Sequence, residues 1–331
     1  MSERNTAAAL GTGPLELTVA GASDLTPRIR RFELRAAAGG QLPAWTPGAH
    51  LDMPVHLATG LATRSYSLIG DCAQRDHYEI AVLRDDAGKG GSLAMHRDYA
   101  SGRVVRCGLP ANQFELHTDE RPCILIAGGI GITPIRSMAI ELQRRGAEFA
   151  LHYAARSVTE TALMDDLCDR FGAKISFWHS DGAPTNQLNI QKVMAGLPGD
   201  GAVYVCGPLG LIQAAIDVSA RLDLPSTCVR FERFSSATPQ AADHAFDVVL
   251  RVSSRVVHVR ANQTILDAVL AAGIPAAFGC RAGQCGTCAV DVLAGEVDHR
   301  DTVLDDADRN LFDRMCICVS RAKFERLEID L

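Results

Sequence analysis

The sequence lacks several features that would each indicate a class of protein. No uninterrupted apolar stretch reaches the roughly 18 residues that a membrane-spanning helix needs, so we expect no membrane span. Runs of lysine or arginine are absent and the formal net charge is −6, which argues against nucleic acid as a partner. Residues 1–13 are polar and small, without the apolar segment of a signal peptide. We therefore expect a cytoplasmic protein.

The sequence also offers no catalytic constellation of the Ser/His/Asp or His/Glu kind. It does contain eleven cysteines, and seven of them are scattered without the spacing of a disulfide framework. We expect most of these seven to be reduced thiols inside a reducing cytosol. They are Cys72, Cys107, Cys123, Cys168, Cys206, Cys228 and Cys316.

The other four cysteines have the spacing of a plant-type [2Fe–2S] site. Cys280, Cys285 and Cys288 read Cys-x4-Cys-x2-Cys, and 29 residues lie between Cys288 and Cys318. Cys316 is a second candidate for the fourth ligand, because in an extended segment it would point to the same side as Cys318. Four zinc thiolates are the alternative, although zinc sites usually show two separated Cys-x2-Cys pairs. We expect an iron–sulfur cluster that carries one electron at a time.

Patterns along the chain indicate a multidomain protein, since 331 residues exceed one ordinary domain. Short alternating strands with glycine turns predict an antiparallel β-barrel in the first part. Strand–helix alternation after Pro122 predicts a doubly wound parallel α/β domain, and the last part reads as a small sheet crossed by one helix. The expected boundaries are 1–118 for the barrel, 119–233 for the α/β domain, 234–244 for a linker and 245–331 for the last domain.

Two glycine-containing loops follow predicted apolar strands of the α/β part. The segment 128–134, Gly-Gly-Ile-Gly-Ile-Thr-Pro, opens a helix, where backbone N–H groups and the helix dipole favour a pyrophosphate. The segment 206–210, Cys-Gly-Pro-Leu-Gly, ends another strand, and ligands of open α/β sheets bind at that edge. The structural alternative for the first segment is a tight strand–helix turn.

The barrel part contains two further candidate segments. Arg64, Ser65, Tyr66 and Ser67 suit a phosphate, an aromatic ring and a ring nitrogen, although alone they also fit an ordinary edge strand. The segment 90–92, Gly-Gly-Ser, suits a phosphate at a helix start or a simple helix cap.

These segments occur in one order, and together they resemble the phthalate dioxygenase reductase family, which includes the vanillate O-demethylase reductases. The likeness covers nearly the whole chain after about Leu15. It includes the segment 231–235, Phe-Glu-Arg-Phe-Ser, and is especially close at 298–301 and 318–322.

The resemblance implies an FMN-binding barrel, an NADH-binding α/β domain and a β-grasp ferredoxin domain with a [2Fe–2S] cluster. It places Arg64, Ser65, Tyr66 and Ser67 along the flavin, with Phe234 beside it and Gly90, Gly91 and Ser92 at its phosphate. Ala81 and Val82 belong to the expected cofactor-binding set, and Gly131, Thr133 and Cys206 line the nicotinamide path. The implied cluster ligands are Cys280, Cys285, Cys288 and Cys318.

The resemblance also implies a function. NADH would supply electrons through FMN and the cluster to a Rieske-type terminal oxygenase that acts on an aromatic or related carboxylate, and we expect a monomer. Arg156 and Ser157 would suit the 2′-phosphate of NADPH, but acidic residues follow at Glu160 and Asp165, so we keep NADH. A stand-alone diaphorase or flavin reductase and a non-enzymatic redox sensor are the competing functions.

Overall fold

The structure is a computed structural model. It describes residues 9–181, 186–225, 227–234, 243–279, 281–310 and 313–331. The chain divides into two compact units, Met1–Glu232 and Arg233–Leu331. Within the described residues, no helix is both long and apolar enough to cross a membrane.

The first part of the first unit is an antiparallel barrel, as predicted. One sheet has the order β5-β2-β1-β6 and a second pairs β3 with β4, and a bridge between Leu68 and Ile80 links the two. Alternate residues of these strands point into one apolar core that includes Leu17, Phe32 and Met53. The elements are β1 Leu15–Asp24, β2 Ile29–Ala36, β3 His50–Leu57, β4 Gly60–Ser67, β5 Tyr78–Leu83, α1 Gly91–Asp98 and β6 Val104–Cys107.

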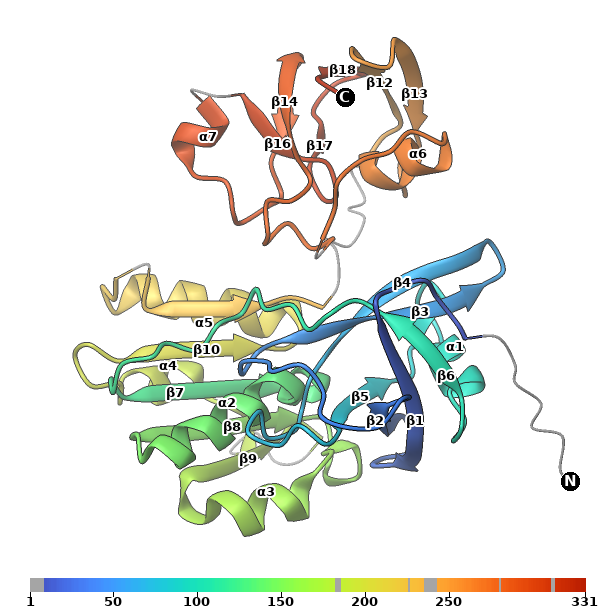
Figure 1. The fold of residues 1–331 in the computed structure, drawn as a ribbon. Helices are drawn as coiled ribbons and strands as arrows, with labels where there is room; N and C mark the ends of the chain where they lie inside the picture. Colours follow the sequence, from blue (N-terminus) through green and yellow to red (C-terminus); the bar gives the residue numbers. More distant parts are fainter. Residues whose placement is uncertain (1–8, 182–185, 226, 235–242, 280, 311–312) are drawn as a thin grey trace, which may run out of the picture. The chain divides into compact units, whose positions relative to one another are not determined.

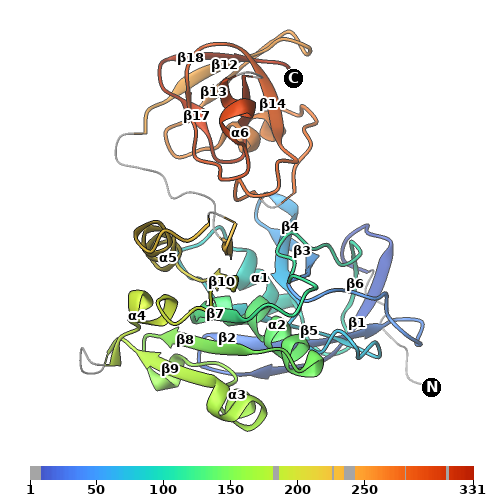
Figure 2. The same cartoon turned by 90° about the vertical axis from the view of Figure 1, so that its left-hand side faces the viewer.

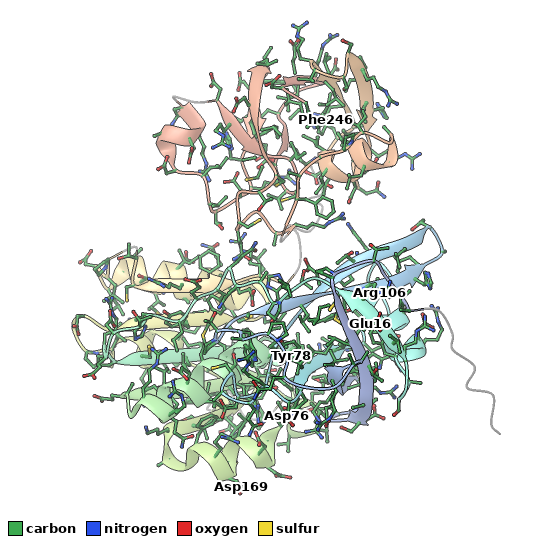
Figure 3. All side chains as sticks on the ribbon, in the orientation of Figure 1. Glu16, Asp76, Tyr78, Arg106, Asp169 and Phe246 are labelled. Atoms are coloured by element: carbon green, nitrogen blue, oxygen red, sulfur yellow. The ribbon has the colours of Figure 1, made fainter. Side chains whose placement is uncertain are left out.

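Polar contacts hold the barrel strands together at their rims. Tyr78 is buried, and its hydroxyl donates to the carbonyl of Pro43 at 2.5 Å. On the outer face Arg106 of β6 pairs with Glu16 of β1 at 2.7 Å, and Figure 3 labels both side chains. The buried and the charged positions at the start of β1 therefore agree with the alternation in its sequence.

The second part of the first unit is a five-stranded parallel sheet of order β11-β10-β7-β8-β9, and Figure 1 shows its strands side by side. Helices α2 and α3 share a core with one face, and α4 and α5 share a core with the other. The strands are β7 Cys123–Gly128, β8 Phe149–Ala155, β9 Ile175–His179, β10 Ala202–Cys206 and β11 Val229–Glu232. The helices are α2 Ile132–Arg145, α3 Met164–Phe171, α4 Ile190–Met194 and α5 Leu209–Arg221, with short 3-10 turns η1 Gly129–Gly131, η2 Val158–Glu160 and η3 Gly172–Lys174.

One helix boundary differs from the sequence-based expectation. The pattern predicts a helix from Thr161 to Phe171, whereas α3 begins at Met164. Thr161 is extended, and Leu163 adopts a left-handed conformation with φ 62°, which interrupts the helical hydrogen bonds. The sequence pattern also predicts strands at Tyr78–Leu83 and Ala202–Cys206, and these are confirmed as β5 and β10.

The second unit is a mixed five-stranded sheet of order β13-β12-β18-β14-β16 with helix α6 packed on it (Figure 2). Strands β12 and β18 are parallel, and the β12–β13 and β14–β18 pairs are antiparallel, which is a β-grasp arrangement. Thr264 caps α6, because its hydroxyl accepts a bond of 3.0 Å from the N–H of Asp267. The elements are β12 Phe246–Leu250, β13 Arg255–Val259, α6 Ile265–Ala271, β14 Ala289–Ala294, β15 Val297–Asp298, α7 Asp306–Asn310, β16 Arg314–Cys316, β17 Arg321–Ala322 and β18 Arg326–Ile329.

Helix α2 attaches the parallel sheet to the barrel through two buried polar side chains. Arg136 is 6% exposed; it donates to the main-chain carbonyl of Ile69 and, through Nε, to Asp166 at 2.9 Å. Ser137 accepts a bond of 3.2 Å from the N–H of Gly48. These hydrogen bonds therefore fix the parallel sheet and the barrel to each other within the first unit.

We expect Arg136→Ala to destabilise the first unit. Removing the guanidinium leaves the carbonyl of Ile69 without its donor, and an unpaired buried polar group costs about 2 kcal/mol. Urea unfolding monitored by flavin release measures the loss. The exposed Arg156→Ala is the matched control and is expected to behave like wild type. Equal stability of the two variants would contradict this role of Arg136.

Candidate functional site

The structure brings together two of the segments expected at the flavin phosphate. Helix α1 begins at Gly91, and Gly90 precedes it in a left-handed conformation with φ 81°. A Cβ on Gly91 would lie 2.7 Å from Cγ of Arg64, so the arginine stem fills the space beside this glycine. A guanidinium therefore lies at a helix N-terminus, and both groups favour an anion.

The other residues of β4 that are expected along the flavin have side chains that point in different directions. Ser65 donates to Asp52 at 2.6 Å on the exposed side of β4. Tyr66 packs against the barrel core, and burial raises the pKa of its hydroxyl. Ser67 is buried at the end of the strand. Ser92 accepts a bond of 3.0 Å from the N–H of Asp85, which fixes the loop before α1.

Ala81 and Val82 lie on β5 with their side chains in two different apolar clusters. Ala81 packs with Ala162 of the α/β part, and Val82 belongs to the barrel core. The carbonyl of Val82 contacts the ring of His96 at 2.9 Å. A contribution of these two residues to a cofactor site would therefore come from the main chain.

The two glycine-containing loops of the α/β part meet backbone to backbone. A Cβ on Gly131 would lie 2.1 Å from the carbonyl oxygen of Cys206, a distance that no side chain tolerates. The second loop also touches the first at its start, since a Cβ on Gly207 would lie 2.9 Å from Cα of Gly128. Because these positions have no side chains, the loops at the carboxyl ends of β7 and β10 can pack directly against each other.

Gly129 differs from its neighbours, because it faces open space. Its φ is +53°, a left-handed conformation that favours glycine, and nothing lies within 4 Å of a Cβ built on it. Thr133 is buried, and its hydroxyl donates to the carbonyl of Ile130 at 2.9 Å, which closes the turn before α2. The turn thus presents bare backbone at a helix N-terminus, as a pyrophosphate requires.

Glu232 is a candidate functional residue to which the sequence interpretation gave no role. Its carboxyl lies beside the side chain of Ser67, and its β11 position pairs with Cys206 of β10. One carboxyl oxygen is buried without a hydrogen-bond partner among the described residues. Burial raises the pKa of Glu232 to about 8, and burial together with this carboxyl raises the pKa of the Cys206 thiol. The signal in the sequence was a glutamate at the end of a short strand, within the segment 231–235 that carries the family resemblance.

The buried carboxyl should make the stability of the protein depend on pH. Unfolded glutamate ionises near 4.5, whereas folded Glu232 holds its proton to about 8. Between these values the folded state binds more protons, so wild-type stability falls as the pH rises. Glu232→Gln removes this dependence, and we expect a gain of up to about 3 kcal/mol above pH 8 that vanishes near pH 4.

Thermal unfolding at pH 4, 6 and 8.5 measures this difference, and Glu115→Gln on the surface is the control. A Glu232→Gln variant that is less stable than wild type at pH 8.5 would show that the buried carboxyl is ionised.

Phe234, expected beside the flavin, belongs to the second unit and is 48% exposed. The first unit therefore contains all the other residues expected at the flavin and the nicotinamide.

The second unit brings together two of the expected cluster ligands. The side chains of Cys288 and Cys318 lie next to each other and are 3% and 2% exposed. Cys285 lies in the loop before them, and Cys280 lies outside the described residues. Within the described ranges no three His, Cys, Asp or Glu side chains converge as a single-ion site. Two buried cysteines that meet from a loop and from a distant segment fit two of the four ligands of a [2Fe–2S] cluster.

Cys316 also reaches Cys288. Its side chain lies next to that of Cys288, and it is fully buried. The segment is not extended as the alternative for the fourth ligand supposed, because residues 317–319 form a turn closed by the N–H of Ser320 on the carbonyl of Cys316 at 3.0 Å. A turn and not an extended strand therefore places Cys316 and Cys318 near Cys288.

Asp301 fixes this segment against the cysteine loop. Its fully buried carboxylate accepts from the hydroxyl of Ser320 and from the N–H of Leu304, both at 3.1 Å, and pairs with Arg309 at 3.3 Å. The cysteine loop packs directly on it, since a Cβ on Gly283 would lie 2.9 Å from Cα of Asp301. The fourth-ligand segment and the loop are thereby positioned by one carboxylate.

Comparisons with known proteins agree with both units. Residues 249–323 match the 2Fe-2S iron-sulfur cluster binding domain, and residues 125–217 match the oxidoreductase NAD-binding domain. The chain is 39% identical over 308 residues to the vanillate O-demethylase oxidoreductase of Acinetobacter baylyi, covering 93% of this chain and 96% of the relative. It is 35% identical over 322 residues to the phthalate dioxygenase reductase of Burkholderia cepacia, covering 96% and 98%.

A solved structure supports the same relationship. It is that of phthalate dioxygenase reductase, described as modular for electron transfer from pyridine nucleotides to [2Fe-2S]. Its TM-score is 0.77 at 36% identity, covering 96% of this chain and 98% of that one. Fold and sites thus define an electron-transfer oxidoreductase that uses NADH, FMN and a [2Fe–2S] cluster. The chain belongs to the phthalate dioxygenase reductase family.

Proposed function

We propose that this chain is the reductase component that delivers electrons from NADH to a Rieske-type terminal oxygenase acting on an aromatic or related carboxylate. The observation that carries the proposal is the 39% identity to a vanillate O-demethylase oxidoreductase across 93% of the chain. Vanillate and phthalate, in the names of two relatives, are both aromatic carboxylates. When bound, FMN supplies the conversion from a two-electron hydride to single electrons for the cluster.

The residues of the first unit support specific parts of this function. Arg64 with the start of α1 at Gly91 would hold the FMN phosphate. Glu232 carries a proton at neutral pH, because its pKa is about 8, and it lies beside Ser67 at the end of β4. The bare backbone at Gly129 would bind the NADH pyrophosphate, while Gly131, Thr133 and Cys206 shape the turn that presents it.

The proposal includes the cluster ligands and the organisation of the chain. Cys280, Cys285, Cys288 and Cys318 would bind one [2Fe–2S] cluster. The boundaries 1–118, 119–233 and 245–331 would separate the FMN, NADH and ferredoxin domains. We also infer that the protein is a cytoplasmic monomer.

Gly131 is unsuited to a test of NADH binding, because any side chain there collides with the carbonyl of Cys206. Gly129 is the better position, since it faces open space in a conformation that asparagine also tolerates. We expect Gly129→Asn to raise KM for NADH about tenfold and Gly129→Asp to raise it about tenfold more, as the carboxylate repels the pyrophosphate.

Steady-state kinetics with ferricyanide as acceptor measure both variants, and a thermal unfolding curve controls for the fold. Equal KM values for the asparagine and aspartate variants would place the pyrophosphate elsewhere.

A full-length Cys285→Ser variant tests the order of the electron carriers. Loss of the cluster should leave NADH oxidation by ferricyanide near the wild-type rate, because hydride transfer needs only the first unit. Reduction of cytochrome c and of the purified oxygenase should fall to background. Cys168→Ser, at an exposed cysteine of α3, is the matched control and should keep both activities.

The proposed order of carriers, from flavin to cluster to oxygenase, is wrong if the cluster-free variant reduces the oxygenase at the wild-type rate. The cluster would then lie off the pathway.

A further inference from the structure

Cys316 is a buried thiol without a role in the four-ligand site, and its surroundings are specific. It ends β16, where it pairs with Ala289, the first residue of β14 and the neighbour of Cys288. The N–H of Ile317 donates to the carbonyl of Cys288 at 3.3 Å, so the two main chains are also joined beside the thiols. Register alone therefore brings Cys316 next to one of the predicted ligands.

The side chains of Cys316 and Cys288 lie next to each other, one at the end of β16 and the other directly before β14. Cys316 is 0% exposed and Cys288 is 3% exposed. Apolar core residues of the module, among them Met315 and Ile317, pack in the same cluster. The two sulfurs are thus shielded from water, where a hydrogen bond has more effect on nearby charge than at the surface.

The direction of a hydrogen bond between the two sulfurs follows from the chemistry of ligation. A cysteine that binds iron does so as a thiolate and has no proton to donate. Between these two sulfurs only Cys316 can then be the donor, through its S–H. Reduction of a cluster adds a negative charge to the cluster and its sulfurs, and donors to those sulfurs stabilise the reduced form.

We propose that Cys316 donates its S–H to the ligand sulfur of Cys288 and thereby raises the reduction potential of the cluster. Cys316 is a positioning residue in this sense, because it acts through Cys288. The inference rests on the ligand set given under the proposed function, but it does not depend on which oxygenase accepts the electrons.

The test compares Cys316→Ala, Cys316→Val and Cys316→Ser in the full-length protein, after reconstitution with iron and sulfide. Ala and Val remove the donor, one leaving a cavity and the other filling it, and Ser restores a donor. We expect reduction of the cluster to become about three- to tenfold less favourable in both Ala and Val. For one electron this is about 30–60 mV more negative, and Ser should return the potential toward wild type.

Redox titration monitored by electron paramagnetic resonance gives the potential, and iron analysis gives the cluster content. Electron–nuclear double resonance of the reduced protein in H2O and D2O adds a second readout. An exchangeable proton coupling assigned to the thiol should be present in wild type and absent in Ala and Val.

The results separate the role of Cys316 as a donor from the identity of the fourth ligand and from the ligand set as a whole. Unchanged potentials in Ala and Val with the cluster intact overturn the inference. Opposite shifts in Ala and Val also overturn it, because packing would then be the cause. Loss of the cluster in Cys316→Ser with retention in Cys318→Ser would make Cys316 a ligand and reverse the assignment. Wild-type protein without iron would instead refute the ligand set.

Discussion

The contact between two bare backbone segments at the carboxyl edge of the parallel sheet is the constraint on which the first unit depends. Gly131 and the carbonyl of Cys206 approach so closely that no Cβ fits between them. This contact brings the end of β7 and the end of β10 to one point, and the adjacent β11 carries Glu232 to the same edge. The barrel strand β4 then ends at that edge with Ser67, whose side chain lies beside Glu232. Residues from distant parts of the chain meet because two glycine-containing loops leave room.

The second unit uses the same principle with a different anchor. Gly283 lets the cysteine loop pack on Asp301, and Asp301 in turn fixes Ser320, two residues after Cys318. A cluster whose ligands come from a loop and a distant segment needs this support, because the loop alone cannot set the position of the fourth thiolate. The ion pair with Arg309 and the bond to Leu304 satisfy the buried charge of the carboxylate.

Much of the fold could be predicted from the sequence. Continuous apolar segments such as 202–206 can only be buried parallel strands in this context, and alternation in 78–83 describes a barrel strand, so both agree with the structure. The start of α3 could not be predicted, because the left-handed Leu163 depends on packing around the preceding turn rather than on helix propensity. Within the candidate site, the sequence indicated that Arg64 and Gly91 belong to one phosphate site, but nothing in their spacing indicated that the arginine fills the space beside the glycine.

The sequence by itself determined the order of the modules and the cysteine spacing, because ligands that share a loop are encoded by local distance along the chain. It also determined the glycines of the two nucleotide loops, since backbone access demands the absence of side chains. Only the tertiary structure decided that the Glu232 carboxyl lies beside the Ser67 side chain and near Cys206. It also decided that Cys316 lies next to Cys288. Those meetings depend on strand order and register between segments far apart in the chain, where a one-residue shift reverses the face on which each side chain lies.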